Sequence, residues 1–185
     1  MKRANIRKQI PILSILMVAI VFTACAKVDI GDEYDHRADI KVTNVTFEAP
    51  EGMEYDEETG NASIEKEDMA VYFNYWKSTE RDDYRYFDDF DEELCKEFEN
   101  ESLKEFYGKE IDFEITRFEK YKIDGIPAYR FEEEYTVDGQ HVLYTSIMVG
   151  ADEIHTFNYE QDGTLDYTEA IEESIKSIHF EYEEK

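Results

Sequence analysis

Hydrophobic and polar residues alternate along much of the chain beyond residue 39, and this alternation predicts β-strands. Ile40–Phe47 is rich in β-branched residues and is followed by the turn Pro50-Glu51-Gly52. In Met69–Trp76, apolar or aromatic side chains occupy both alternating sets, which is typical of a strand covered on both faces. Asn61–Ile64 is a shorter candidate strand. We therefore expect the folded region to begin with strands.

Two segments change to a period of three or four residues, which predicts amphipathic helices. The first has an expected body from Phe90 to Tyr107 and a suitable C-terminal stop at Gly108. Its expected apolar stripe is Phe87, Phe90, Leu94, Phe98, Ser102 and Phe106. The second helix has the stripe Ala170, Ile171, Ser174, Ile175 and Ile178. A short extended segment, His179–Tyr182, follows it.

Between the two helices the pattern predicts an antiparallel meander. The alternation that starts at Ile111 loses its phase at Phe118, which indicates a bulge near Arg117. Asp138-Gly139 is a strong two-residue hairpin signal, and pairing across it places Tyr135 opposite Val142. A second tight turn at Ala151-Asp152 then places Tyr144 opposite Tyr159 and Ser146 opposite Phe157.

This register divides the meander into two faces of different character. The packed face is expected to hold Tyr129, Phe131, Tyr135, Val142, Tyr144, Met148, Phe157 and Tyr159. The other face is expected to hold Arg130, Glu132, Glu134, Thr145, Thr156, Asn158 and Glu160. The fold class is therefore α+β, an antiparallel β-sheet meander flanked by two main helices, with the sheet largely wet on one side.

The composition narrows the class of protein. A length of 185 residues suits one folded domain. Lys and Arg number 20 against 46 Asp and Glu, and the net charge is −26. Because nucleic-acid binders carry a clustered basic surface, we expect no nucleic-acid partner.

The first 25 residues have the features of an export signal. Four basic residues precede Ile10–Phe22, an apolar run too short for the roughly 20 residues that span a bilayer. The following Thr23-Ala24-Cys25 resembles the bacterial lipobox. That resemblance implies cleavage between Ala24 and Cys25 and a diacylglycerol on the Cys25 thiol.

The expected organisation follows from this leader. Residues 1–24 are the signal peptide, residues 25–38 a lipidated tether, and residues 39–185 a single α/β domain. Because two acyl chains anchor a protein stably, we expect the chain at the extracytoplasmic face of the cell membrane.

The order of elements and four short segments resemble the PsbP/DcrB-like α/β fold, which occurs in several bacterial lipoproteins and in a photosystem II extrinsic subunit. The segments are Phe47–Gly52, Asp124–Tyr129, Val137–Gln140 and Ala170–Ile178. The resemblance implies a PsbP-like α/β sandwich and binding or accessory work. It implies no active site, since the family shares none.

Candidate chemistry is sparse. The acidic run Asp82–Glu93 has the oxygen ligands that Ca²⁺ prefers but lacks the EF-hand glycine, so we expect a solvated helix start. Cys95 is expected to be a small buried residue rather than a nucleophile. The four histidines, His36, His141, His155 and His179, show no zinc spacing. We therefore expect no metal and no other cofactor.

The tyrosines are the remaining candidates for binding. Tyr129, Tyr135, Tyr144 and Tyr159 either line a ligand groove or pack beneath a helix with their hydroxyls at the rim. The favoured function is a membrane-anchored binding or accessory module without enzymatic activity, with a basic or envelope protein as a candidate partner. The alternative is an envelope hydrolase or a metal-dependent enzyme that uses carboxylates. Two or more buried ionisable groups that converge in one pocket would favour that alternative.

Overall fold

The computed structural model describes residues 40–66, 69–78, 87, 89–162 and 166–184. The expected signal peptide, the tether and Cys25 lie outside these residues. The strands are β1 (Ile40–Thr46), β2 (Asn61–Lys66), β3 (Met69–Ser78), β4 (Phe113–Ile123), β5 (Ile126–Val137), β6 (Gln140–Gly150), β7 (Ile154–Asp162) and β8 (His179–Glu184). The long helices are α2 (Glu92–Tyr107) and α3 (Thr168–Lys176).

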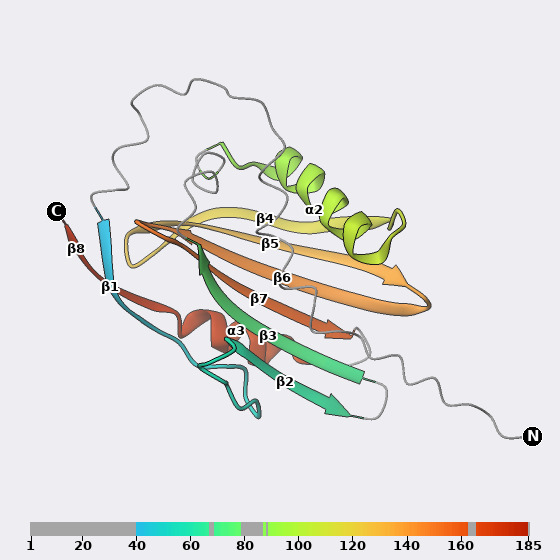
Figure 1. Ribbon diagram of the computed structural model, residues 1–185, viewed down its shortest axis with the longest axis horizontal. Helices are drawn as coiled ribbons and strands as arrows, with labels where there is room; N and C mark the ends of the chain where they lie inside the picture. The colour runs from blue at the N-terminus through green and yellow to red at the C-terminus, as the bar shows by residue number, and fades with distance from the viewer. Residues whose placement is uncertain (1–39, 67–68, 79–86, 88, 163–165, 185) are drawn as a thin grey trace, which may run out of the picture.

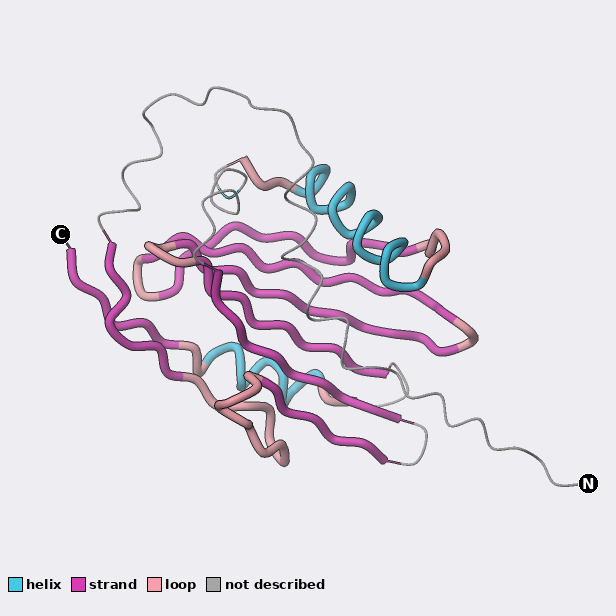
Figure 2. The backbone as a smooth tube through the Cα atoms, in the orientation of Figure 1, coloured by secondary structure: helices cyan, strands magenta, loops and turns pink. Residues whose placement is uncertain are grey.

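Six strands form one antiparallel sheet in the order β2-β3-β7-β6-β5-β4, and β1 pairs with β8 in a separate two-stranded sheet. Helix α2 lies against one face of the large sheet, whereas α3 and the β1/β8 pair lie against the other (Figures 1 and 2). We call these the α2 face and the α3 face. The expected α+β class with two main helices is confirmed, but the sheet is packed on both faces.

Helix α2 ends at the expected residue but begins two residues later than expected, at Glu92 rather than Phe90. The Asp91 carboxylate accepts a hydrogen bond from the Leu94 backbone N–H at 2.9 Å, and Gly108 ends the helix in the left-handed conformation (φ 67°). The expected apolar stripe is displaced by one position, however. The buried residues are Cys95, Glu99 and Leu103, so the helix turns a glutamate toward the sheet.

The hairpin between β5 and β6 has the predicted register, with Tyr135 opposite Val142. Asp138 and Gly139 both have positive φ, as a two-residue turn that follows the twist of the strands requires. The predicted bulge is also present, since the pairing of β4 with β5 shifts between Ile115 and Arg117. Both features come from local chemistry that the sequence shows directly.

The predicted register between β6 and β7 is wrong by one residue. Gly150 pairs with Ile154, which leaves a loop of three residues rather than two, closed by a hydrogen bond of 3.0 Å from Ala151 N–H to the Glu153 carbonyl. Because a slip of one residue turns every side chain to the other face, Phe157 and Tyr159 point to the α3 face. Thr156, Asn158 and Glu160, expected on a wet face, join the α2 face instead.

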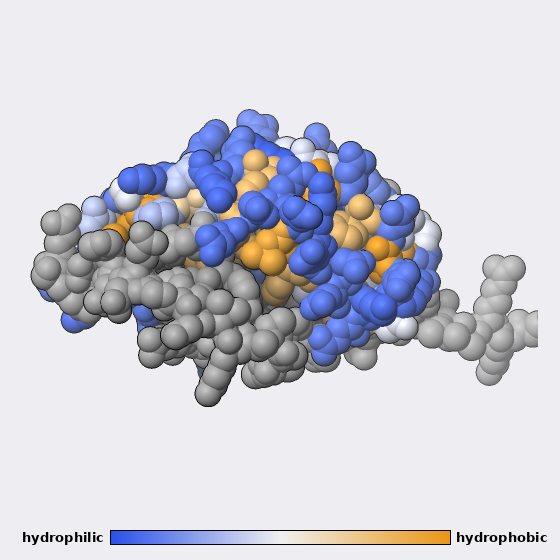
Figure 3. Space-filling model, turned by 90° about the horizontal axis from the view of Figure 1, so that it is seen from above, coloured by the Kyte–Doolittle hydropathy of each residue, from blue (hydrophilic) through white to orange (hydrophobic). Residues whose placement is uncertain are grey.

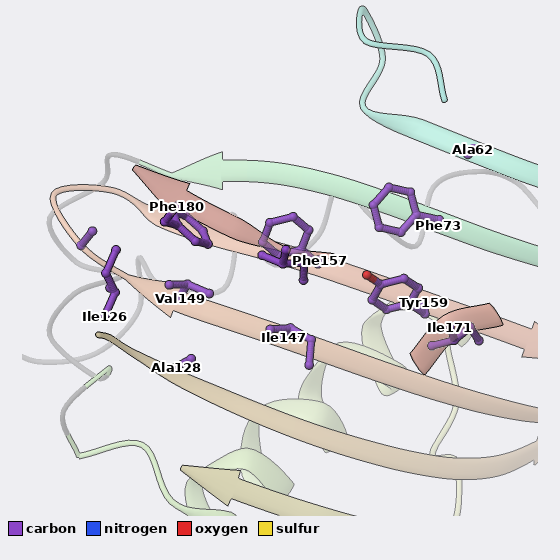
Figure 4. Packing of buried hydrophobic residues seen from close by; sticks show 12 residues of the cluster. Ala62, Phe73, Ile126, Ala128, Ile147, Val149, Phe157, Tyr159, Ile171 and Phe180 are labelled. Atoms are coloured by element: carbon purple, nitrogen blue, oxygen red, sulfur yellow. The ribbon is translucent and has the colours of Figure 1, made fainter. Parts of the chain in front are cut away.

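The α3 face holds the larger apolar core (Figure 4). Tyr159 lies in it beside Ile171 of α3 and packs on Phe73, with ring centroids 5.0 Å apart. Arg130, also expected in solvent, is buried on this face and donates hydrogen bonds to the carboxylates of Glu132 and Glu172. Helix α3 therefore covers the surface that the sequence pattern assigned to water.

The surface around α2 and β4 is largely hydrophilic, with small separate hydrophobic areas (Figure 3). Among the described residues, no helix combines the length and the apolar character needed to cross a membrane.

Candidate functional site

The four tyrosines proposed as a ligand groove do not form one. Tyr129, Tyr135 and Tyr144 lie on the α2 face, but Tyr159 lies on the α3 face, where its hydroxyl is 3.1 Å from the Ser174 hydroxyl. Tyr129 donates a hydrogen bond to the Phe87 carbonyl within an aromatic cluster. The rings of Tyr129, Tyr135 and Tyr144 pack beneath α2 and that of Tyr159 beneath α3, in line with the alternative that these tyrosines pack beneath a helix.

The α2 face instead collects ionisable groups in one line across the sheet. Glu133 of β5 pairs with Tyr144 of β6, Tyr144 pairs with Glu160 of β7, and Glu160 pairs with Tyr72 of β3. We call these four residues the central row. Neighbouring strands lie about 4.8 Å apart, so the backbones of Glu133 and Glu160, one on each side of Tyr144, are about twice that distance from each other.

Helix α2 adds a third carboxylate above the central row. Glu99 is only 7% exposed and Glu133 only 3% exposed. Repulsion from Glu99 raises the pKa of both Glu133 and Tyr144, in each case after the larger effect of burial, which indicates that the groups are close together. The three glutamates and Tyr144 therefore form one cluster between the helix and the sheet, in which Glu99 and Glu133 are buried and Tyr144 and Glu160 keep partial exposure.

Burial favours the neutral form of each carboxyl group. It raises the pKa of Glu99 to about 8 and that of Glu160 to about 7. The pKa of Glu133 is raised well above its usual value, first by burial and then by the charges of Glu99 and Glu160. The cluster consequently holds protons at a pH where exposed glutamates are ionised.

Within the described part of the chain, no Lys, Arg or His forms an ion pair with Glu99, Glu133 or Glu160. The ion pairs there involve other carboxylates, such as Arg130 with Glu172 and Lys77 with Glu153. The same residues contain no group of three or more His, Cys, Asp or Glu side chains arranged to hold a metal ion. The described residues thus offer these three carboxyl groups neither a cationic side chain nor further ligands for a metal ion.

Unpartnered polar atoms gather on the same face. Among the described residues, seven buried side-chain polar atoms have no hydrogen-bond partner. Two of them, on Tyr121 and His155, belong to the α3 face. The other five lie on the α2 face of the sheet or on α2 itself: Asn74 Oδ1, Trp76 Nε1, Ser102 Oγ, Glu133 Oε2 and Thr156 Oγ1. We call these five residues the polar strip.

The residues of the polar strip differ in their exposure to solvent. Asn74, Glu133 and Thr156 are each 3% exposed, whereas Trp76 and Ser102 keep part of their surface in contact with solvent. Its atoms include donors, acceptors and a carboxyl oxygen. Buried polar groups in proteins are nearly always hydrogen-bonded, so these five unpaired atoms on one face are a candidate binding site.

The other chemical candidates from the sequence do not join this site. Cys95 is fully buried as expected, and burial followed by repulsion from Glu99 raises its pKa, which disfavours the reactive thiolate. His155 lies on the α3 face, 2.9 Å from the Tyr75 hydroxyl. Burial there lowers the pKa of His155 to about 4, so its imidazole is neutral. His155 cannot act as a base for Cys95, because Cys95 lies on the α2 face.

The acidic run is described only in part, because Asp82, Asp83 and Asp88 lie outside the described residues. Its other members, Asp89, Asp91, Glu92 and Glu93, are exposed, and Asp91 caps α2. His36 lies outside the described residues as well.

Sequence reasoning missed the three glutamates because acidic residues are so common in this chain. One signal was available at Glu133, which interrupts an otherwise apolar set running from Tyr129 to Val137. A second was available at Glu99, which stands one helical turn from both Cys95 and Leu103. An ionisable residue at a core position of a regular pattern is a more specific signal than a run of exposed carboxylates.

Comparisons with known proteins concern the fold. No protein-family model matches the chain, and no curated protein matches it. The solved structure of CyanoP, the PsbP of Synechocystis sp. PCC 6803, aligns with 85% of this chain and 99% of its own, at 11% identity and a TM-score of 0.47. LpqN, which is involved in cell envelope biogenesis of Mycobacterium tuberculosis, aligns with 83% of this chain and 99% of its own, at 11% identity and a TM-score of 0.46. These similarities concern the arrangement of helices and strands, and no activity follows from them.

Proposed function

We propose that this protein is a membrane-anchored lipoprotein of the cell envelope whose domain binds a small polar ligand at the polar strip. The observation that carries the binding role is the gathering of five unpartnered buried polar atoms on the α2 face. A buried donor or acceptor without a partner destabilises the folded state by about 1–3 kcal/mol. A ligand that supplies the missing partners recovers that free energy on binding.

The expected anchor supports the envelope location. The basic residues, the short apolar run and Thr23-Ala24-Cys25 occur in the order that a lipoprotein signal requires. A tether between Cys25 and β1 would hold the domain near the membrane while leaving it free to meet its ligand. The expectation of a basic or envelope protein partner remains part of this proposal.

The part of the α2 face that solvent can reach lies at the β3 end of the polar strip. Trp76 and Tyr72 of β3 keep partial exposure, as does Glu160 in the neighbouring β7. Asn74, Thr156 and Glu133 lie deeper. The larger apolar core lies on the other face, so a ligand that binds at the β3 end of the strip would leave that core intact.

Thermal shift with the full chain tests the proposal. The probes are a panel of small amines, sugars, alcohols and carboxylic acids, each at millimolar concentration. We expect at least one class to raise the melting temperature of the wild type, and Thr156→Val to remove that increase because it deletes the Thr156 hydroxyl. Trp76→Phe, which deletes the indole N–H, is a second variant in case Thr156→Val does not fold.

Thr136→Val is the matched control, since Thr136 is exposed and lies on the same strand as Glu133 but on the opposite face. It should leave the shift unchanged. An absence of any shift in the wild type, or an equal shift in Thr156→Val, Trp76→Phe and the control, would contradict the proposed site.

A second candidate function is an envelope hydrolase, because two buried carboxyl groups, those of Glu99 and Glu133, and the partly exposed carboxyl group of Glu160 lie between α2 and the sheet. A carboxyl group with a pKa near 7 suits general acid catalysis. Hydrolysis of nitrophenyl glycosides, esters or phosphates that is lost in Glu160→Gln but retained in Glu134→Gln would favour this candidate. Equal rates in both variants would exclude a role for Glu160.

A further inference from the structure

The three glutamates of the cluster pose a problem of charge rather than of hydrogen bonding alone. Buried charges in proteins are normally paired with an opposite charge or bound to a metal. Here the described residues supply neither, and one oxygen of the deepest carboxyl group, Glu133 Oε2, has no hydrogen-bond partner. Ionisation of these carboxyl groups therefore calls for a cation that the described residues do not supply.

The geometry of the central row suits an elongated cation. Its two carboxyl groups stand on β5 and β7, with the Tyr144 ring between them and Tyr72 beyond Glu160. Tyrosine rings attract organic cations through their faces. Glu99 approaches the same row from α2. A row of carboxylates and aromatic rings is the environment in which ammonium groups are held in proteins.

We infer that the central row, together with Glu99, binds an organic cation with protonated amine groups, which pair with Glu160 at the partly exposed end and with Glu133 at the buried end. The inference rests on the proposed function and names the chemical class of its ligand. The polar strip then receives the uncharged polar atoms of the same molecule. A metal ion does not fit, because the described side chains do not converge in the way that metal ligation requires.

Binding should be linked to protons. Among the described residues, the titratable groups that interact electrostatically with Glu133 are Glu99, Cys95 and Tyr107 on α2, Tyr135 on β5, Tyr144 on β6 and Glu160 on β7. None of these is a cation. An amine that enters the row favours the ionised carboxylates, so at pH 6 the glutamates release protons as the amine binds, and the affinity increases as the pH rises.

Isothermal titration calorimetry with 1,5-diaminopentane tests the inference on the full chain in detergent. We expect saturable binding to the wild type, with an apparent enthalpy at pH 6 that differs between buffers of different ionisation enthalpy. Glu133→Gln should weaken binding at least tenfold. Binding of the neutral 1,5-pentanediol should be at least tenfold weaker than that of the diamine.

Two control variants distinguish the site from the general acidity of the chain. Glu101→Gln on α2 is exposed, and Glu134→Gln on β5 faces the opposite side of the sheet. Both should bind the diamine as the wild type does. Equal losses in all three variants, equal binding of the diol, or an enthalpy independent of the buffer would overturn the inference.

Failure of this inference differs from failure of the proposed function. If sugars, alcohols or carboxylic acids alone shift the melting temperature of the wild type, and Thr156→Val removes the shift, the binding site stands and the cationic ligand is refuted. If no class of compound shifts it, the binding function is refuted as well. If Glu133→Gln does not fold, Glu160→Gln at the exposed end of the row must show the tenfold loss.

Discussion

Replacing Glu160 by glutamine should stabilise the protein at alkaline pH and leave its stability at acidic pH nearly unchanged. Burial raises the pKa of Glu160 to about 7 in the folded protein, against an ordinary value of 4.5. The folded state therefore holds a proton that the unfolded chain loses as the pH rises. Glutamine resembles the protonated form at every pH, so the variant lacks this titration.

The sign and size follow from linkage. For a group whose pKa is raised by folding, the stabilisation is present in full below pH 4.5 and is lost as the pH rises to about 7. A difference of one pKa unit corresponds to about 1.4 kcal/mol, so the wild type should lose about 3 kcal/mol relative to the variant across this range. That value is an upper one, because the Glu160 side chain keeps some contact with water.

Urea denaturation of the full chain at pH 4.5, 6 and 8.5, followed by circular dichroism, measures the effect. The difference in unfolding free energy between Glu160→Gln and wild type should grow steadily over these three values. Glu101→Gln on the exposed side of α2 corrects for the general repulsion within a chain of net charge −26. A difference that is the same at all three pH values, or as large in Glu101→Gln, would refute the view that Glu160 is buried without a cation.

Three further changes test other parts of the structure. Cys25→Ser should move the protein out of the membrane fraction and abolish labelling by a palmitate analogue, whereas continued labelling would contradict lipidation at that residue. Arg130→Met should lower the unfolding free energy by roughly 2 kcal/mol because it unpairs carboxylates at the interface with α3, whereas Lys176→Met, which breaks an exposed pair, should have a much smaller effect. Gly60→Ala places a methyl group 2.4 Å from a backbone oxygen of β3, and we expect a larger loss of stability than the roughly 1 kcal/mol for Gly139→Ala, whose position is open. Equal losses in the two glycine variants would exclude the close approach.

The features of the fold that the sequence predicted correctly are those fixed by short-range chemistry. Asp138-Gly139 determines its own turn, and the change of phase at Phe118 marks the bulge. Helix α2 likewise ends at its predicted C-terminal stop, Gly108. Each of these signals acts within a few residues of the position that it fixes.

The features that the sequence did not predict depend on contacts between distant segments. The loop after Gly150 can hold two or three residues, and the choice of three is decided by which face of β7 the core needs. The apolar set of Phe157 and Tyr159 completes the core under α3, while Glu160 turns toward α2. The sequence alone could not place that glutamate beside Glu133, because their proximity follows from this register.

Carboxyl ¹³C NMR of the full chain, labelled at glutamate, tests most directly the claim that the α2 face holds buried carboxyl groups awaiting a cation. We predict that the resonances of Glu99, Glu133 and Glu160 stay in the protonated range at pH 6, where exposed glutamates are ionised, and move to the ionised range when 1,5-diaminopentane is added. Glu101 should not respond to the diamine. Titration of all three glutamates below pH 5, or chemical shifts that do not change when the diamine is added, would contradict the account.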